Sequence, residues 1–251
     1  MKILIPLLIT TFAGLSTVLG AFIIFLKLKE YQINRFIVLC LSFAMGVMIT
    51  ISITELLPES YIQLLTVYPF FKASMIAMIA FFLGFLLILF INRKVKQEAK
   101  VGSSLYRLGI LSMLALILHN FPEGIATFMS AYQDVGLGLQ LGLAIMLHNI
   151  PEGICIAVPI YYATKSKKQA ISKTFLSGLA EPLGAILAWI FLSQFITDAF
   201  ISITLIFVAG IMTTLSINEI YPKAVEYKEY KYLIIGFILG SVLMLINHFA
   251  F

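Results

Sequence analysis

Long apolar segments constrain the fold of this chain more than any other feature of its sequence. Charged or turn-rich stretches separate them, and each is long enough for the roughly 20 residues that a helix needs to cross a bilayer core. We predict spans near residues 3–26, 34–56, 70–91, 105–130, 137–161, 171–194, 200–220 and 231–250. Because lipid offers no partners to backbone N–H and C=O groups, each span must be helical. The sequence therefore predicts an all-α polytopic membrane protein with eight transmembrane helices.

The composition agrees with this prediction. Hydrophobic residues make up 61% of the 251 positions and charged residues 12%, against roughly 45–50% and about 25% in soluble domains. The spans use nearly the whole chain, so we expect residues 1–251 to form a single transmembrane domain with no soluble enzyme beside it. The run at 3–26 is too long for the apolar core of a signal peptide, and we interpret it as the first span.

The distribution of the basic residues predicts the orientation. Of the 17 Lys and Arg residues, 15 lie in or beside the connections that follow the first, third, fifth and seventh spans. The positive-inside rule places these connections in the cytoplasm and both termini on the extracellular or periplasmic side, which requires an even number of spans. This asymmetry accounts for the net charge of +5, so no nucleic-acid partner is expected.

The fourth and fifth predicted spans carry nearly the same hexapeptide. Residues 119–124 read His-Asn-Phe-Pro-Glu-Gly, and residues 148–153 read His-Asn-Ile-Pro-Glu-Gly on the next helix, which runs in the opposite direction. A weaker echo relates residues 52–58 in the second span to residues 216–222 in the seventh. Inverted repeats are a common architecture of transporters, whose binding sites lie near the bilayer midplane. We therefore predict an inverted repeat around the fourth and fifth spans.

The hexapeptide places metal-binding groups on one helix face. His119 and Glu123 are four residues apart, as are His148 and Glu152, so each imidazole lies above a carboxylate on the same side of its helix. Two such faces that meet across antiparallel helices bring two His and two Glu side chains together. Inward-pointing carboxylates and His residues on facing helices hold metal pairs in other bundles.

The position of the acidic residues strengthens this interpretation. Glu123, Glu152 and Glu181 lie near the middle of their spans, where an acidic residue carries an insertion penalty of about 2.5–3.5 kcal/mol. No Lys or Arg lies at a comparable depth in the sequence, so the counter-charge must be a proton or a cation. A protonated, hydrogen-bonded Glu explains any one of them, but two divalent ions nearly balance all three.

Proline and asparagine residues extend the predicted site. Pro122 and Pro151 each leave a carbonyl without its helical donor, and free backbone at membrane depth is tolerated only where it lines protein or a watery cavity. Asn120 and Asn149 follow the His residues by one position, a turn of about 100° around the helix. Their side-chain oxygens can contribute to a second ion site that the Glu residues bridge. In the sixth span, Glu181 likewise stands beside a proline and small residues.

The types of ligand narrow the choice of metal. Imidazole and carboxylate without thiolate favour Zn²⁺, Fe²⁺, Mn²⁺, Co²⁺ or Cd²⁺, whereas Ca²⁺ and Mg²⁺ prefer shells made of oxygen alone. Cys40 and Cys155 lie in apolar stretches, and we interpret them as packing residues rather than ligands. We expect broad selectivity and no organic cofactor.

These residues also carry a resemblance over the whole chain. The two hexapeptides and the Glu-Pro of the sixth span resemble the ZIP (Zrt/Irt-like) family of metal transporters, closest to its bacterial GufA or ZupT-like branch. The resemblance implies import of zinc and related ions into the cytoplasm across the plasma (inner) membrane, through a binuclear centre. It also implies a homodimer, and an elevator-like or rocking motion of spans 1, 4, 5 and 6 against spans 2, 3, 7 and 8. Carried over residue by residue, the metal ligands are His119, Asn120, Glu123, His148, Asn149, Glu152 and Glu181.

The chain departs from its family pattern in two places. Many relatives have a His-rich connection between the third and fourth spans, but residues 92–104 are short and contain no His, which argues against metal sensing there. Some relatives have Gln-Asp in place of His148-Asn149, a change that affects selectivity. The chain should therefore not be assumed to be specific for zinc.

Five further polar residues allow two interpretations. Glu55 and Glu59 near the outer end of the second span recruit metal at the mouth, or reach solvent at the interface. Asn218 and Glu219 near the inner end of the seventh span receive metal at the exit, or are interfacial in the same way. His248 near the outer end of the last span is interpreted as interfacial rather than as a ligand.

Two other classes of function, an enzyme and a receptor, fit the sequence less well than transport. An intramembrane metalloprotease also buries His and Glu, but it needs an arrangement such as His-Glu-x-x-His. Here Asn follows both hexapeptide His residues and no such pentapeptide occurs, so an enzyme is not expected. A metal-gated receptor needs a domain outside the membrane to transmit its signal, and the predicted spans leave no room for one.

Overall fold

The computed structural model of the chain describes residues 3–98, 104–191 and 197–250, and their regular structure is helical. Eight segments are long and apolar enough to cross a membrane, which confirms the predicted all-α architecture. They are Leu4–Phe25, Glu30–Val67, Phe70–Lys94, Ser104–Gln133, Val135–Thr164, Lys167–Phe191, Asp198–Glu226 and Tyr230–Ala250.

Several spans are built from more than one helix. The α-helices are α1 (Leu4–Ala21), α2 (Glu30–Ile51), α3 (Leu57–Val67), α4 (Phe70–Glu98), α5 (Ser104–Gln133), α6 (Val135–Thr164), α7 (Lys167–Gly178), α8 (Ala180–Phe191), α9 (Asp198–Leu215), α10 (Tyr221–Glu226) and α11 (Tyr230–Ala250). The short helices are η1 (Phe22–Phe25), η2 (Ser52–Leu56) and η3 (Ser216–Ile220). The second span thus joins α2, η2 and α3, and the seventh joins α9, η3 and α10.

The second span is longer than the sequence predicted. Its helix does not stop before Pro58 but continues to Val67, because η2 is a π-helical turn and Pro58 falls in the first turn of α3. The widened π turn accommodates the proline, whose ring and missing N–H interrupt the regular i→i−4 hydrogen bonds of an α-helix. The π-helical turn η3 precedes Pro222 in the same way. The weak echo between these two segments is therefore a repeat in the structure as well.

Local signals explain the tight connections around the central pair of helices. Asp134 separates α5 from α6, and its Oδ1 accepts a hydrogen bond of 2.9 Å from the N–H of Leu137 at the start of α6. At the other end, α6 stops at Lys165, whose φ of 57° lies in the left-handed region. The Ser166 side chain then accepts from the N–H of Gln169 and caps α7. These short connections force α5, α6 and α7 to run antiparallel.

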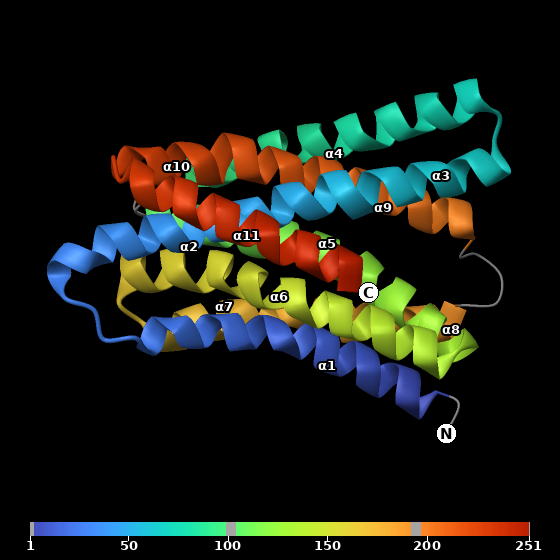
Figure 1. Cartoon of the computed structure of the whole chain (residues 1–251), viewed down its shortest axis with the longest axis horizontal. Coiled ribbons are helices and arrows are strands. Elements are labelled where there is room, and N and C mark those ends of the chain that lie inside the picture. The colour runs from blue at the N-terminus through green and yellow to red at the C-terminus, as the bar shows by residue number, and fades with distance from the viewer. Residues whose placement is uncertain (1–2, 99–103, 192–196, 251) are drawn as a thin grey trace.

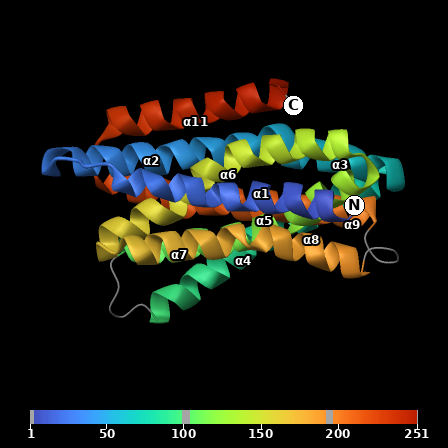
Figure 2. The ribbon, with the colours of Figure 1, turned by 90° about the horizontal axis from the view of Figure 1, so that it is seen from below.

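The helices form two packed groups (Figures 1 and 2). In one group, α1 packs along α6, and α5 packs on α6 and α8. In the other, α2 packs along α11, and α4 and α3 pack on α9. Contacts of α6 with α2 and of α5 with α9 join the groups, so α5 and α6 lie at the centre.

The two ends of the bundle differ in their connections. We call the end where α1 begins and α11 ends the terminal end, which lies to the right in Figure 1. The opposite end, where α2, α5, α7 and α11 begin, carries most of the Lys and Arg residues and is called the basic end.

Glycine residues beside the hexapeptides allow backbones to touch. A Cβ added at Gly153 would lie 1.8 Å from the Thr17 carbonyl oxygen of α1. A Cβ added at Gly124 would lie 2.1 Å from the carbonyl oxygen of Glu181. This close approach brings α1 and α8 against the centre of the molecule.

The largest apolar core lies on the basic side of the hexapeptides. Its residues come from most of α2 and from the halves of α5, α6 and α9 nearest the basic end, among them Leu111, Ile156 and Met212, which are fully buried. Cys40 and Cys155 belong to this core and are both free thiols. They therefore pack as predicted and take no part in a disulfide.

Candidate metal centre

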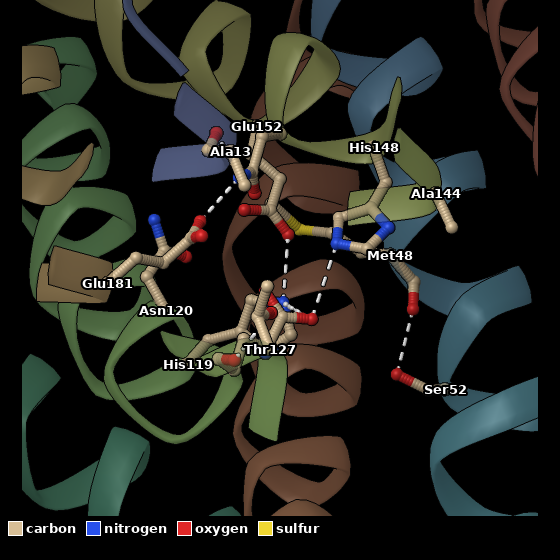
Figure 3. A network of polar contacts seen from close by, with 12 residues as sticks. Ala13, Met48, Ser52, His119, Asn120, Thr127, Ala144, His148, Glu152 and Glu181 are labelled. Carbon is tan, nitrogen blue, oxygen red and sulfur yellow. Dashed lines mark hydrogen bonds and ion pairs between the residues drawn. The ribbon is translucent and has the colours of Figure 1, made fainter. Parts of the chain in front are cut away.

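The two hexapeptides meet at the middle of α5 and α6 (Figure 3). The Nε2 atom of His119 lies 3.2 Å from Glu123 Oε1 and 3.2 Å from Glu152 Oε1. The Nε2 atom of His148 lies 3.2 Å from the same Glu123 Oε1. All four side chains are buried. The structure thus brings together the two imidazoles and two of the carboxylates that the helical spacing predicted.

The distances in this cluster are those between ligands of one ion. Two atoms that each lie about 2.1 Å from a tetrahedral zinc are roughly 3.4 Å apart. The ligand atoms of His119, Glu123 and His148 all lie within 4.8 Å of one another. Neither Nε2 atom has the geometry of a hydrogen bond to its carboxylate. The convergence of these atoms therefore fits metal coordination better than a hydrogen-bonded network.

The charge of the cluster points the same way. Glu123, Glu152 and Glu181 are at most 5% exposed. Within the described residues, the ion pairs of these carboxylates are formed with His119 and His148 and not with Lys or Arg. An unpaired buried carboxylate costs several kcal/mol unless it is neutralised or coordinates a metal. Three carboxylates at this depth therefore favour the binding of multivalent cations.

Asn149 and Glu181 place a second group of polar atoms beside the first. The Nδ2 atom of Asn149 donates to the carbonyl oxygen of Ala13 at 2.9 Å and also to Glu181 Oε1. The Nδ2 atom of Asn120 donates to the carbonyl oxygen of Ser177 at 3.4 Å. Both amides are therefore oriented by their nitrogen atoms. Their Oδ1 atoms are buried and accept no hydrogen bond within the described chain, so they remain available to a cation.

Sequence reasoning did not identify the residues that orient these amides. Ala13 and Ser177 act through their backbone carbonyls, which no residue pattern reveals. The available signal was the pair of small residues Gly14 and Gly178, whose backbones approach each other in the structure. A sequence reveals residues with this role only indirectly, when small residues lie where two predicted helices are expected to touch.

Two cavities connect the cluster with the terminal end. The first has a volume of about 320 Å³, and its lining includes Glu123 and His148 of the cluster as well as Glu55 and Glu59. The second, of about 550 Å³, shares Glu55 and Glu59 and extends to His248 and other residues near the α5–α6 connection. The centre is thus approached from the terminal end through cavities that carry acidic residues.

At the basic end, Glu219 has protein partners. It is 8% exposed, and its Oε2 lies 3.3 Å from Arg107 Nη1. The side chain of Asn92 donates to Glu219 and accepts from Arg107. Asn218 is exposed and lines a small cavity at this end. The sequence had suggested that Glu219 reaches solvent or receives metal, and it did not predict a buried ion pair with Arg107.

Comparisons with known proteins place this geometry in context. Residues 93–248 match the family model described as ZIP Zinc transporter. The chain is 39% identical to the zinc transporter ZupT of Streptococcus mutans, over 97% of this chain and 96% of that protein. It is 42% identical to the zinc transporter ZupT of Chlorobium phaeovibrioides, with 96% of each chain covered. The protein of the same name from Oceanobacillus iheyensis is 40% identical over 98% of this chain and 97% of its own length.

Proposed function

This chain belongs to the ZIP zinc transporter family, and we propose that it carries Zn²⁺ and related divalent ions across the membrane. The observation that carries the proposal is the buried cluster of His119, Glu123, His148 and Glu152, reached by cavities from one end of the bundle. Because the family consists of transporters, the chain is a transporter and not an enzyme.

The donor atoms support a binuclear centre. One ion is held by His119, Glu123 and His148 with Glu152 beside them, as the 3.2 Å separations suggest. A second ion is held by the side-chain oxygens of the two asparagines and of Glu181, with Glu123 and Glu152 as bridging carboxylates. The buried, unbonded oxygen atoms in this region support the second position. Fe²⁺, Mn²⁺, Co²⁺ and Cd²⁺ suit the same mixture of nitrogen and oxygen ligands.

The cavities and the core suggest how an ion moves. An ion from the terminal end passes the carboxylates of Glu55 and Glu59 and exchanges its water for the ligands of the centre. The apolar core on the basic side separates the centre from that end. Release therefore requires the two helix groups to move relative to each other. We propose that α1 and α5–α8 move as a unit against the remaining helices, in the alternating access that transporter repeats support.

The orientation rests on the distribution of charge. We propose that the basic end faces the cytoplasm, because Lys- and Arg-rich connections are retained there, and that ions move inward across the plasma (inner) membrane. A homodimer remains part of the proposal. The helices α4 and α11 support it, because only 17% and 22% of the residues in their most apolar stretches are buried within one chain. Their remaining apolar surface is available to a second copy or to lipid. Cross-linking of the protein in its native membrane tests the homodimer.

Uptake of ⁶⁵Zn²⁺ into proteoliposomes tests the transport function. Glu123→Ala and Glu152→Ala should each abolish uptake, because each removes a ligand and leaves buried His groups without their carboxylate. Glu226→Ala is the matched control, since this Glu is 60% exposed at the basic end and should transport like wild type. Equal uptake by wild type and the two centre variants would overturn the proposal. Repeating the assay with and without a pH gradient shows whether protons are coupled to transport.

A further inference from the structure

A second group of potential ligands surrounds Glu55 at the terminal end. The Oε1 atom of Glu55 is buried and accepts no hydrogen bond from the described residues. The Nδ1 atom of His248 on α11 lies 3.7 Å from it. This distance is too long for a hydrogen bond, but it is close to the roughly 3.4 Å between two ligands of one tetrahedral zinc. Glu59 lines the same cavity.

Asn247 supplies an independent observation. Its side chain is 2% exposed and lines the cavity together with Glu55 and His248. The Nδ2 atom donates to the carbonyl oxygen of Ala144 at 3.3 Å, which orients the amide. The Oδ1 atom is buried and accepts no hydrogen bond in the described part of the chain. Buried amide oxygens are normally satisfied, so this atom indicates a partner that is not a protein group.

The inverted repeat provides an internal comparison for Glu55. Glu219 occupies the same position in η3 that Glu55 occupies in η2, the fourth residue of a π-helical turn with proline three residues later. At the basic end, Glu219 is neutralised by Arg107, and the Asn92 amide bonds both groups. Asn92 is on the third span and Asn247 on the eighth, so an asparagine accompanies the carboxylate at both ends.

Among the described residues that line the cavities around Glu55, no counterpart of Arg107 is present. Neither of the two cavities that Glu55 lines has a Lys or Arg among its described lining residues. The carboxylate and the asparagine recur in the repeat, whereas the guanidinium does not. A bound cation would supply the missing positive charge and would also satisfy the amide oxygen of Asn247. His248 adds a nitrogen ligand, which favours Zn²⁺ and similar ions over Ca²⁺ or Mg²⁺.

We propose that Glu55, Asn247 and His248, with Glu59 beside them, form a separate divalent-cation site, which we call the terminal-end site. It lies at the mouth of the cavities that lead to His148. Its role in supplying the central cluster rests on the proposed function, but its existence does not, because it requires binding alone. Acidic clefts of this kind raise the local concentration of cations and their association rates.

Equilibrium binding of Zn²⁺ to the purified full-length chain tests the site. Wild type should bind one more ion per chain than His248→Leu. His248→Asp, which keeps a ligand at this position, should retain the additional ion, a result that a purely structural role of His248 would not produce. Ser130→Ala is the matched control, because Ser130 lines the same cavity without belonging to the proposed ligands. Equal numbers of bound ions in wild type and His248→Leu would overturn the inference.

Transport kinetics provide a second measurement that is independent of the ion count. His248→Leu should raise the KM for ⁶⁵Zn²⁺ uptake by about tenfold and leave the maximal rate unchanged, since it weakens capture and not the central ligands. An unchanged KM would contradict the supply role. If Glu123→Ala abolishes uptake while His248→Leu changes neither ion count nor KM, the proposed function stands and the terminal-end site falls.

Discussion

Substitution of Gly153 by Ala tests whether backbone contact between α1 and α6 builds the metal centre. The new Cβ would lie 1.8 Å from the Thr17 carbonyl oxygen, whereas ordinary contact begins at 3.4 Å. The difference means that α1 must retreat by about 1.6 Å. The hydrogen bond from Asn149 Nδ2 to the Ala13 carbonyl oxygen, now 2.9 Å, would then exceed hydrogen-bond length.

The energies of these changes can be compared. Overpacking costs about 1–3 kcal/mol, and the lost interhelical hydrogen bond costs about 0.6 kcal/mol in a membrane protein. Replacing Gly by Ala in a helix returns about 1 kcal/mol. Gly153→Ala should therefore destabilise the protein by about 0.6–2.6 kcal/mol, and zinc uptake should fall in the protein that remains folded, because the Asn149 amide loses its orientation.

To rank the variants by stability, each purified protein is heated in detergent, and the fraction that remains monodisperse is measured. Gly136→Ala is the control on the same helix, because its Cβ would come close only to a side-chain atom, the Asp134 carboxylate oxygen at 3.0 Å, which can shift by a few tenths of an ångström, and to no backbone atom. We expect Gly136→Ala to match wild type and Gly153→Ala to lose its folded fraction at lower temperature. If the two variants behave alike, close contact between the backbones of α1 and α6 is not what positions Asn149.

Three other substitutions have definite expected results. His148→Cys replaces an imidazole of the centre by a thiolate, so Cd²⁺ should become a stronger competitor of ⁶⁵Zn²⁺ uptake relative to Mn²⁺. An unchanged ratio of inhibition by the two ions would show that His148 is not a ligand. Glu181→Gln should reduce the zinc bound at the centre by one ion while the cluster around His119 keeps the other, as counted by equilibrium dialysis, and a full count would refute the second position. Arg107→Leu leaves the buried Glu219 without its cation and should cost about 3 kcal/mol in thermal stability. Adding Glu219→Gln should restore most of the loss, and no restoration would contradict the ion pair.

The features that could be predicted from the sequence are those fixed within one helix. The eight spans follow from the requirement of lipid for long apolar helices, and the structure reproduces them. The alignment of His119 with Glu123 follows from helical spacing, and so does the alignment of His148 with Glu152. That these two faces meet across α5 and α6 could also be anticipated, because the predicted spans 105–130 and 137–161 leave only a short connection, which makes the helices antiparallel neighbours; in the structure the connection is Asp134 alone.

Contacts between distant helices could not be predicted in the same way. Arg107 and Glu219 lie on α5 and η3, and Glu55 and His248 on η2 and α11. Whether such groups meet depends on how far each helix is rotated about its axis and on which rotamers the packing allows. Composition and periodicity do not determine that rotation. For this reason the position of His248 Nδ1, 3.7 Å from Glu55 Oε1, could not be anticipated from the sequence, which predicted an interfacial residue.

The π-helical turns η2 and η3 determine part of this rotation. A π turn contains one residue more than an α-helical turn, and each residue of an α-helix corresponds to about 100° around its axis. If the same residues formed a regular α-helix in place of η2, every side chain beyond this turn would be rotated by about 100° around the helix axis. Glu59 would then leave the cavity wall that it shares with Glu55. The direction in which the side chains of α3 point relative to those of α2 thus depends on one additional residue in η2.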